Sequence, residues 1–188
     1  MLRVVVIGVM LFSSALACTL SSGSDDDVIS AEPTNTTLPE MPIVYYYFAA
    51  ILSNTFPAGS VVIVPDQLIL SPTVSTIPRT NDSAENIRLA LQAMMNDPSN
   101  VWTSSDLALN GVTFDGSQAM VTLSGTISGP GDTVLIAARV QLLLTVFAES
   151  AVQTAVITLN GENIGNLGIS HSSESKPANY AYTRAEVW

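Results

Sequence analysis

The chain has very little cysteine, histidine or positive charge, and each shortage excludes a class of function. Its 188 residues include one cysteine and one histidine, and 6 basic residues stand against 16 acidic ones, for a net charge of -10. One cysteine cannot form an internal disulfide, and a tetrahedral zinc site needs more cysteine and histidine than this. An acidic chain repels phosphate backbones, so we expect no nucleic-acid binding. We likewise expect no metal and no cofactor.

The one cysteine, Cys18, ends an apolar segment at the start of the sequence. Arg3 is a short positive region, and Val4–Leu11 is strongly apolar before small residues take over. This layout is typical of a secretory signal peptide over residues 1–17, too short for a membrane-spanning helix. The last four letters, "ALAC", resemble a bacterial lipobox with Ala15 in the place of the usual leucine. A cysteine there accepts a diacylglycerol through its thiol, and a second acyl chain completes a stable anchor.

We therefore predict a lipoprotein held through Cys18 on the extracytoplasmic face of the cell membrane. A chance cysteine behind an ordinary signal peptide is the alternative, because "ALA" is also an acceptable cleavage site. Residues 18–42 are rich in Ser, Thr, Pro and acidic residues and poor in apolar ones. Such a segment buries too little surface to offset its ordering entropy, so we expect a disordered acidic tether. Its Asp25–Asp27 run lacks the ligand spacing of an EF-hand loop.

Residues 43–168 predict a single α+β domain. The aromatic and β-branched stretch Ile43–Ala50 is typical of a strand, and "VVIVP" with "QLILS" predicts a second strand region. Pro72–Thr80 contains two prolines and predicts a loop. Asp82 then suits a helix N-cap with an acid three positions later, a capping-box arrangement. The apolar residues of this helix recur on one face, at Ile87, Ala90, Leu91 and Met94.

The second half of the domain repeats a strand–strand–helix order. Asp115-Gly116 predicts a tight turn between two strands, and Asn160-Gly161 predicts another after the last long strand. Between them, Gly129–Asp132 predicts a loop that opens the helix "TVLIAARVQLLLTVFAES". This helix is apolar nearly all round, so we expect it to be largely buried. The Gly-rich loop lacks the lysine and the spacing of a phosphate-binding motif, so we interpret it as a turn and cap.

The order β-β-α-β-β-α-β-β predicts two helices packed on one mixed sheet. One face of the second helix would then lie on the sheet, and the other would be covered by the first helix or by another protein; we expect the first helix. Residues 169–188 form a polar C-terminal tail with three aromatic residues. The sequence leaves open whether this tail is a flexible end or docks its aromatic side chains on the domain.

Several stretches together resemble the GerMN domain of the sporulation and spore-germination family. These are the first strand "VYYYF", the helix end "ALQAMMNDP", the hairpin "GVTFDGSQAMVTLSG", the helix "ARVQLLLTV" and the end "SAVQTAVITLNG". The resemblance covers about Ile43 to Gly165 in one copy, with Asp97 replacing a glycine and Thr122 an aspartate. It implies a lipid-anchored module, similar to the ring-building folds of envelope-spanning channels, without catalytic residues. The family's tandem second copy is missing, so the resemblance implies an envelope scaffold whose partner is unknown.

The hypothesis is thus a non-enzymatic module that binds another envelope protein. Strand alternation puts Tyr45 and Tyr47 on one face and Tyr46 and Phe48 on the other. The pair outside the core is our candidate partner-binding site, because tyrosine is favoured at recognition surfaces. The alternative is a cell-wall-active or peptide-active enzyme whose site is not visible in the sequence; its only histidine, His171, lies in the polar tail. A third hypothesis is a small-ligand lipoprotein that feeds a transporter.

Overall fold

The computed structural model describes residues 42–49, 56–63, 68–104, 106–168 and 175–187. The signal peptide, the lipidation site Cys18, nearly all of the tether and His171 lie outside the described residues. Within them, the α+β class is confirmed, and its elements lie in one compact unit.

The elements follow one another along the chain as β1 to β8 and α1 to α3, with one short 3-10 helix, η1. In order they are β1 (Pro42–Ala49), β2 (Val61–Ile63), β3 (Leu68–Pro78), α1 (Ser83–Met95), β4 (Ala108–Phe114), β5 (Gln118–Ser124), α2 (Asp132–Phe147), β6 (Thr154–Leu159), β7 (Glu162–Asn163), η1 (Ile164–Asn166), β8 (Tyr182–Thr183) and α3 (Arg184–Val187).

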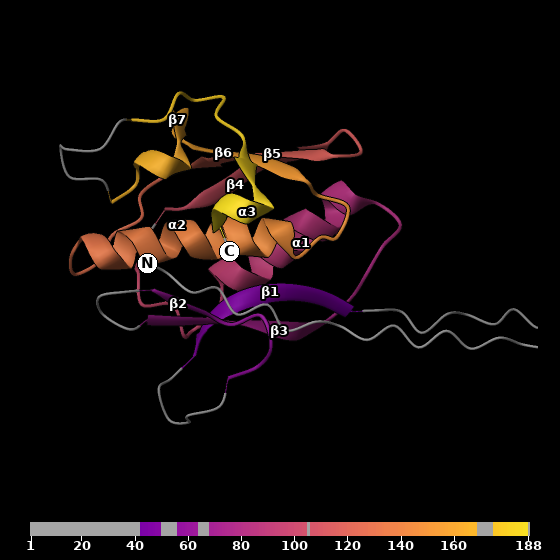
Figure 1. Cartoon of the computed structure of the whole chain (residues 1–188), viewed down its shortest axis with the longest axis horizontal. Helices are drawn as coiled ribbons and strands as arrows, with labels where there is room; N and C mark the ends of the chain where they lie inside the picture. The colour runs from indigo at the N-terminus through magenta and orange to yellow at the C-terminus, as the bar shows by residue number, and fades with distance from the viewer. Residues whose placement is uncertain (1–41, 50–55, 64–67, 105, 169–174, 188) are drawn as a thin grey trace, which may run out of the picture. The chain divides into compact units, whose positions relative to one another are not determined.

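The strands form two sheets rather than the one that we predicted. An antiparallel sheet has the order β1-β3-β2, and a mixed sheet has the order β4-β5-β6-β7 with β8 added beside β6. The helices α1 and α2 lie between the two sheets and contact each other, β1, and strands of the mixed sheet (Figure 1). The chain therefore folds as three layers, and the N-terminal strands form a layer of their own.

Strand β3 runs through the proline-containing stretch for which we predicted a loop. Pro72 pairs with Tyr46 of β1, while β2 pairs with β3 only as far as Leu70. The backbone N–H and C=O of Tyr46 bond to side chains of α2, so this pair exchanges no ladder bonds. The backbone of Pro72 consequently points to the side where β2 has ended, and its missing N–H costs no hydrogen bond.

Helix α1 begins as predicted, although the capping box is only half formed. The carboxylate of Asp82 accepts hydrogen bonds from the backbone N–H of Ala84 at 2.9 Å and of Glu85 at 3.4 Å. The side chain of Glu85 binds Arg88 instead of returning to the cap. The predicted apolar face is confirmed, since its members are all buried: Ile87, Ala90, Leu91 and Met94.

Helix α2 is buried on nearly all sides, as its composition predicts. Ala137, Ala138 and Leu142 have no exposed surface. The prediction that α1 covers its second face was incomplete, because β1 of the three-stranded sheet also packs on α2. Helix α2 is covered by β1, α1, β6 and α3 and has almost no solvent side, so it lacks the amphipathic pattern that α1 shows.

Both predicted hairpin turns are present in the part of the chain that the structure describes. Asp115, Gly116 and Ser117 connect β4 to β5, and the Asp115 carboxylate accepts the backbone N–H of Gln118 at 2.7 Å. Asn160 and Gly161 both have positive φ, 53° and 83°, as a type I′ turn requires. Strands β5 and β6 pair in parallel, and α2 is the crossover between them.

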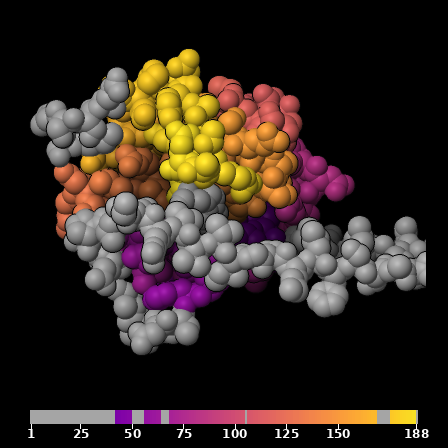
Figure 2. Space-filling view, in the orientation of Figure 1, coloured from indigo at the N-terminus to yellow at the C-terminus, as the bar shows by residue number. Residues whose placement is uncertain are grey.

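Of the two alternatives for the tail, docking is the one observed for residues 175–187. The side chain of Asn166 accepts the backbone N–H of Lys176 at 2.7 Å, and β8 pairs with β6. The guanidinium of Arg184 donates to the carbonyls of Glu149 and Val152 at 2.8 and 2.9 Å. The space-filling view shows these C-terminal residues, in yellow, directly against the orange part of the chain (Figure 2).

Candidate functional site

The aromatic strand β1 has a buried pair and a partly exposed pair. Tyr46 and Phe48 are 4% and 6% exposed and belong to the hydrophobic core. Tyr45 and Tyr47 each keep part of their surface in solvent. Of the four aromatic residues in the candidate partner-binding site, the core pair is therefore Tyr46 and Phe48. The other pair is Tyr45 and Tyr47, of which Tyr45 packs against the core with part of its surface exposed.

Two polar residues one helical turn apart on α2 cover the free edge of β1. The backbone N–H of Tyr46 donates to Thr145 Oγ1 at 3.2 Å, and its carbonyl accepts from Gln141 Nε2 at 3.0 Å. Both α2 side chains are buried. An edge strand exposes unpaired backbone groups that invite pairing with other chains. Helix α2 satisfies these groups at Tyr46 and leaves that part of the edge closed to another strand.

The surroundings of Tyr46 keep its hydroxyl neutral. Burial raises the pKa of Tyr46 to about 12, and the nearby Arg184 opposes this rise only in part. The hydroxyl lies 3.3 Å from the carbonyl oxygen of Gly59, to which it donates. Tyr46 is thus a structural residue in both its backbone and its side chain.

Tyr45 instead points to the end of α1, where its hydroxyl donates to Asp97 Oδ2 at 2.9 Å. Burial and then this hydrogen bond raise the pKa of Tyr45. Asp97 Oδ1 also accepts from the backbone N–H and the hydroxyl of Ser99, at 2.8 and 2.5 Å. Burial disfavours the charge of Asp97, but the Ser99 and Tyr45 hydrogen bonds outweigh it and lower its pKa. Asp97 is therefore ionised at neutral pH and fixed in position.

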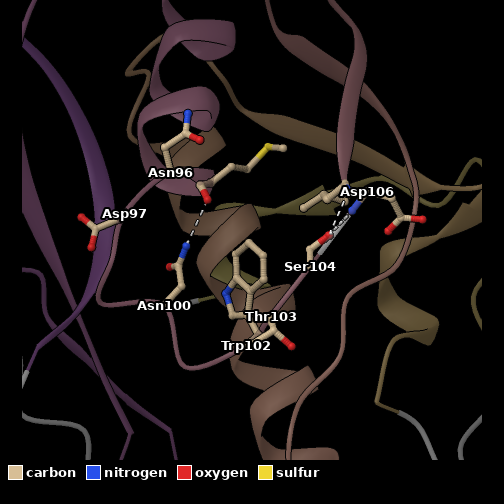
Figure 3. Close-up of a pocket in the computed structure, with 9 residues that line it drawn as sticks. Asn96, Asp97, Asn100, Trp102, Thr103, Ser104 and Asp106 are labelled. Carbon is tan, nitrogen blue, oxygen red and sulfur yellow. Dashed lines mark hydrogen bonds between the residues drawn. The ribbon is translucent and has the colours of Figure 1, made fainter.

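Asp97 is also part of the wall of an open pocket between the end of α1 and the start of β4, shown in Figure 3. We call this cavity of about 370 Å³ the Trp102 pocket. Three of its lining residues are Met95, Trp102 and Leu107, and the others are polar. The polar ones are Asn96, Asp97, Asn100, Thr103, Ser104 and Asp106.

Gln141, which covers the free edge of β1, also fixes two residues of the Trp102 pocket. Trp102 Nε1 donates to Gln141 Oε1 at 2.7 Å, and Gln141 Nε2 donates to Asn100 Oδ1 at 2.9 Å. Asn100 Nδ2 donates in turn to the carbonyl of Met94 at 2.9 Å. One buried side chain therefore links strand β1, the last turn of α1 and the pocket.

Sequence reasoning missed this pocket. Its residues come from the last residue of α1, Met95, and from the irregular stretch that follows, which has no motif spacing. Trp102 and Gln141 are 39 positions apart, so their contact leaves no local pattern. The available signal was the tryptophan itself, since a large aromatic residue in a polar stretch is unusual unless it packs against something.

Comparison of the chain with protein-family models, curated proteins and solved structures finds no match. The GerMN resemblance therefore depends on the sequence motifs alone. Two residues of its helix motif, Gln141 and Thr145, are the ones that bind Tyr46.

Within the described residues, no three His, Cys, Asp or Glu side chains come together in a group that could hold a metal ion. No helix in that part of the chain is long and apolar enough to cross a membrane.

Proposed function

We propose that the chain is a lipid-anchored, extracytoplasmic GerMN-like module that acts by binding another protein of the cell envelope. The anchor is the lipid on Cys18, and residues 18–42 are the tether that separates the domain from the membrane. The binding face is centred on Tyr45 and Tyr47. The observation that supports this face most directly is the division of β1: two aromatic residues belong to the core, while the other two keep exposed surface.

Tyrosine suits such a face because its ring buries apolar area while its hydroxyl stays hydrogen-bonded. The hydroxyl of Tyr45 is held by the fixed Asp97. A side chain already ordered before binding loses less conformational entropy when the partner arrives. Tyr45 is thus a preorganised contact, and Tyr47, two residues along the same face, extends the surface.

A cell-wall-active or peptide-active enzyme remains the alternative, and the pocket beside Tyr45 does contain two carboxylates, Asp97 and Asp106. Glycan cleavage by paired carboxylates needs one whose pKa is raised so that it can donate a proton. The pKa of Asp97 is lowered, and hydrogen bonds already engage both of its oxygens. This chemistry favours binding over hydrolysis.

Two variants, each examined in the native membrane, test the proposal. Cys18→Ala should move the protein from the membrane fraction to the soluble one, and retention in the membrane would contradict the anchor. With Cys18 intact, Tyr45→Ala together with Tyr47→Ala should abolish the species that chemical crosslinking captures. Thr113→Ala with Thr122→Ala, exposed on the other sheet, is the matched control and should leave that species unchanged. Equal crosslinking by both double variants would contradict the binding face.

A further inference from the structure

We propose that the free edge of β4 binds an extended, positively charged peptide segment as an additional strand of the mixed sheet. This binding does not depend on the partner assigned to the tyrosine face. In the mixed sheet, β6 is paired on both sides, by β5 on one edge and by β7 and β8 on the other. Strand β4 pairs only with β5 among the described residues, so its second edge is open. An open edge is a template for another extended chain.

The backbone of β4 presents unused hydrogen-bonding groups on this edge. Asp115 N–H donates to the Gln118 carbonyl at 3.2 Å, which fixes the alternation of ladder bonds in the hairpin. Thr113 therefore bonds to β5, while the N–H and C=O of Val112 and Phe114 point away from it. No hydrogen bond between described residues engages these outward groups. An extended peptide can pair with all of them at once, as strands added to a sheet do.

The edges of the three-stranded sheet, in contrast, are protected against such pairing. Gln141 and Thr145 bind the backbone of β1 at Tyr46. Strand β2 is only three residues long, and the part of β3 beyond it begins and ends with proline, at Pro72 and Pro78. Strand β4 contains neither a proline nor a charged side chain, although these are the residues that usually protect an edge. The fold therefore leaves β4 as the edge most accessible to another strand.

The side chains of β4 define the sequence pattern that the segment needs. A bulge between Leu109 and Gly111 interrupts the ladder, so the regular part of the edge begins at Gly111. Val112 and Phe114 pack against the core with part of their surface exposed, while Thr113 is exposed on the opposite face. Residues that pair across a sheet share a face. The segment should therefore place apolar side chains beside Val112 and Phe114, and a polar one beside Thr113.

Charge determines which extended segment is preferred. Asp106 and Asp115 are exposed just beyond the two ends of β4. Hydrogen bonds from the backbone N–H of Gln118 and of neighbouring turn residues lower the pKa of Asp115, which is therefore ionised at neutral pH. The sequence has no lysine, arginine or histidine between Arg88 and Arg139. A cationic segment is attracted to this region, whereas a second copy of the chain, with its net charge of -10, is repelled.

A labelled peptide tests the proposal directly. The full chain is titrated with fluorescein-labelled Lys-Val-Thr-Val-Thr-Val-Lys, and a saturable rise in fluorescence anisotropy is expected below about 1 mM. N-methylation of the three valines removes the amide donors that face β4 and should weaken binding at least about tenfold. N-methylation of the two threonines, whose amides face away from β4, is the matched control and should leave the affinity unchanged. Glutamate in place of both lysines should weaken binding, most strongly at low salt.

Two pairs of protein variants locate the site. Val112→Pro removes an outward N–H without changing the ladder bonds of Thr113, and it should weaken binding at least about tenfold. Val74→Pro, the same change at an exposed position of β3, should have no effect. Asp115→Asn keeps the acceptor oxygen of the turn and should weaken binding about threefold. Glu162→Gln, at an exposed acidic residue of β7, should not change it.

Three results would overturn the proposal. One is the lack of a saturable response to the lysine peptide up to about 1 mM. Another is an equal effect of the two sets of N-methyl groups, since strand pairing must distinguish them. The third is equal binding by folded Val112→Pro and Val74→Pro proteins, with folding checked by circular dichroism; if Val112→Pro does not fold, equal binding by Asp115→Asn and Glu162→Gln has the same meaning. None of these readouts involves the crosslinked species, so the proposed tyrosine face can fail or stand independently.

Discussion

Tyr46 and Tyr47 are neighbours in one strand and have identical side chains, yet the fold uses them differently. Tyr46 is buried, its backbone is bound by Gln141 and Thr145, and its pKa is raised to about 12. Tyr47 is partly exposed, on the face that it shares with Tyr45. The difference arises from strand alternation, which α2 fixes by closing one edge of β1. An aromatic-rich strand can therefore supply core residues and a recognition surface at once.

The largest expected effect is a difference in stability between substitutions on the two faces of β1. Phe48→Ala should lower the free energy of unfolding by about 3–5 kcal/mol, because it opens a cavity in the core. Tyr47→Ala should lower it by about 1 kcal/mol or less, because the ring is only partly buried. Urea unfolding followed by circular dichroism measures both. Similar costs at the two positions would show that the faces of β1 do not differ as described.

Gln141→Leu removes the side chain that joins β1 to the Trp102 pocket. The change leaves the Tyr46 carbonyl, Trp102 Nε1 and Asn100 Oδ1 each short of a partner, so we expect a loss of about 2–4 kcal/mol. Gln92→Leu is the control, since Gln92 is an exposed residue of α1 and should change stability by about 0.5 kcal/mol or less. A Gln141→Leu protein as stable as the control would mean that the buried network contributes little.

A smaller effect is expected on the stability of the protein at alkaline pH. Tyr46 has a higher pKa in the folded protein, about 12, than its ordinary value of 10.0. Its stabilising contribution is therefore complete below pH 10 and is lost as the pH rises toward 12. Tyr46→Phe should flatten this part of the stability curve, and at neutral pH it removes the 3.3 Å hydrogen bond from the hydroxyl to Gly59. Thermal unfolding of both proteins between pH 9 and pH 12 checks this, and parallel curves would contradict it.

Local patterns in the sequence predicted the helices and the turns. The Asp82 cap, the apolar face of α1 and the two hairpin turns all depend on residues close together in the chain. The failures involve contacts between distant residues. Pro72 is tolerated in β3 because β2 ends at Leu70 and α2 binds the backbone of Tyr46, and none of this is visible near the proline.

The candidate site was predictable to a similar extent. Alternation correctly divided the four aromatic residues into two pairs, but only the structure identifies Tyr46 and Phe48 as the core pair. The Trp102 pocket was not predicted, because its fixed geometry comes from Gln141, a residue of a helix that appeared to be purely a core element. The uniform apolarity of α2 predicted burial without indicating that a second sheet covers it.

The central claim is that the Tyr45 and Tyr47 face binds a protein partner in the envelope. Its most direct test replaces Tyr47 with the photocrosslinker p-benzoylphenylalanine in the anchored protein in living cells. Met120, 49% exposed on the other sheet, is replaced in the same way as the control. The proposal predicts a discrete crosslinked species from position 47, which is absent from position 120 and lost when Tyr45→Ala is added. Crosslinking from position 120 alone, or equally from both positions, would contradict it.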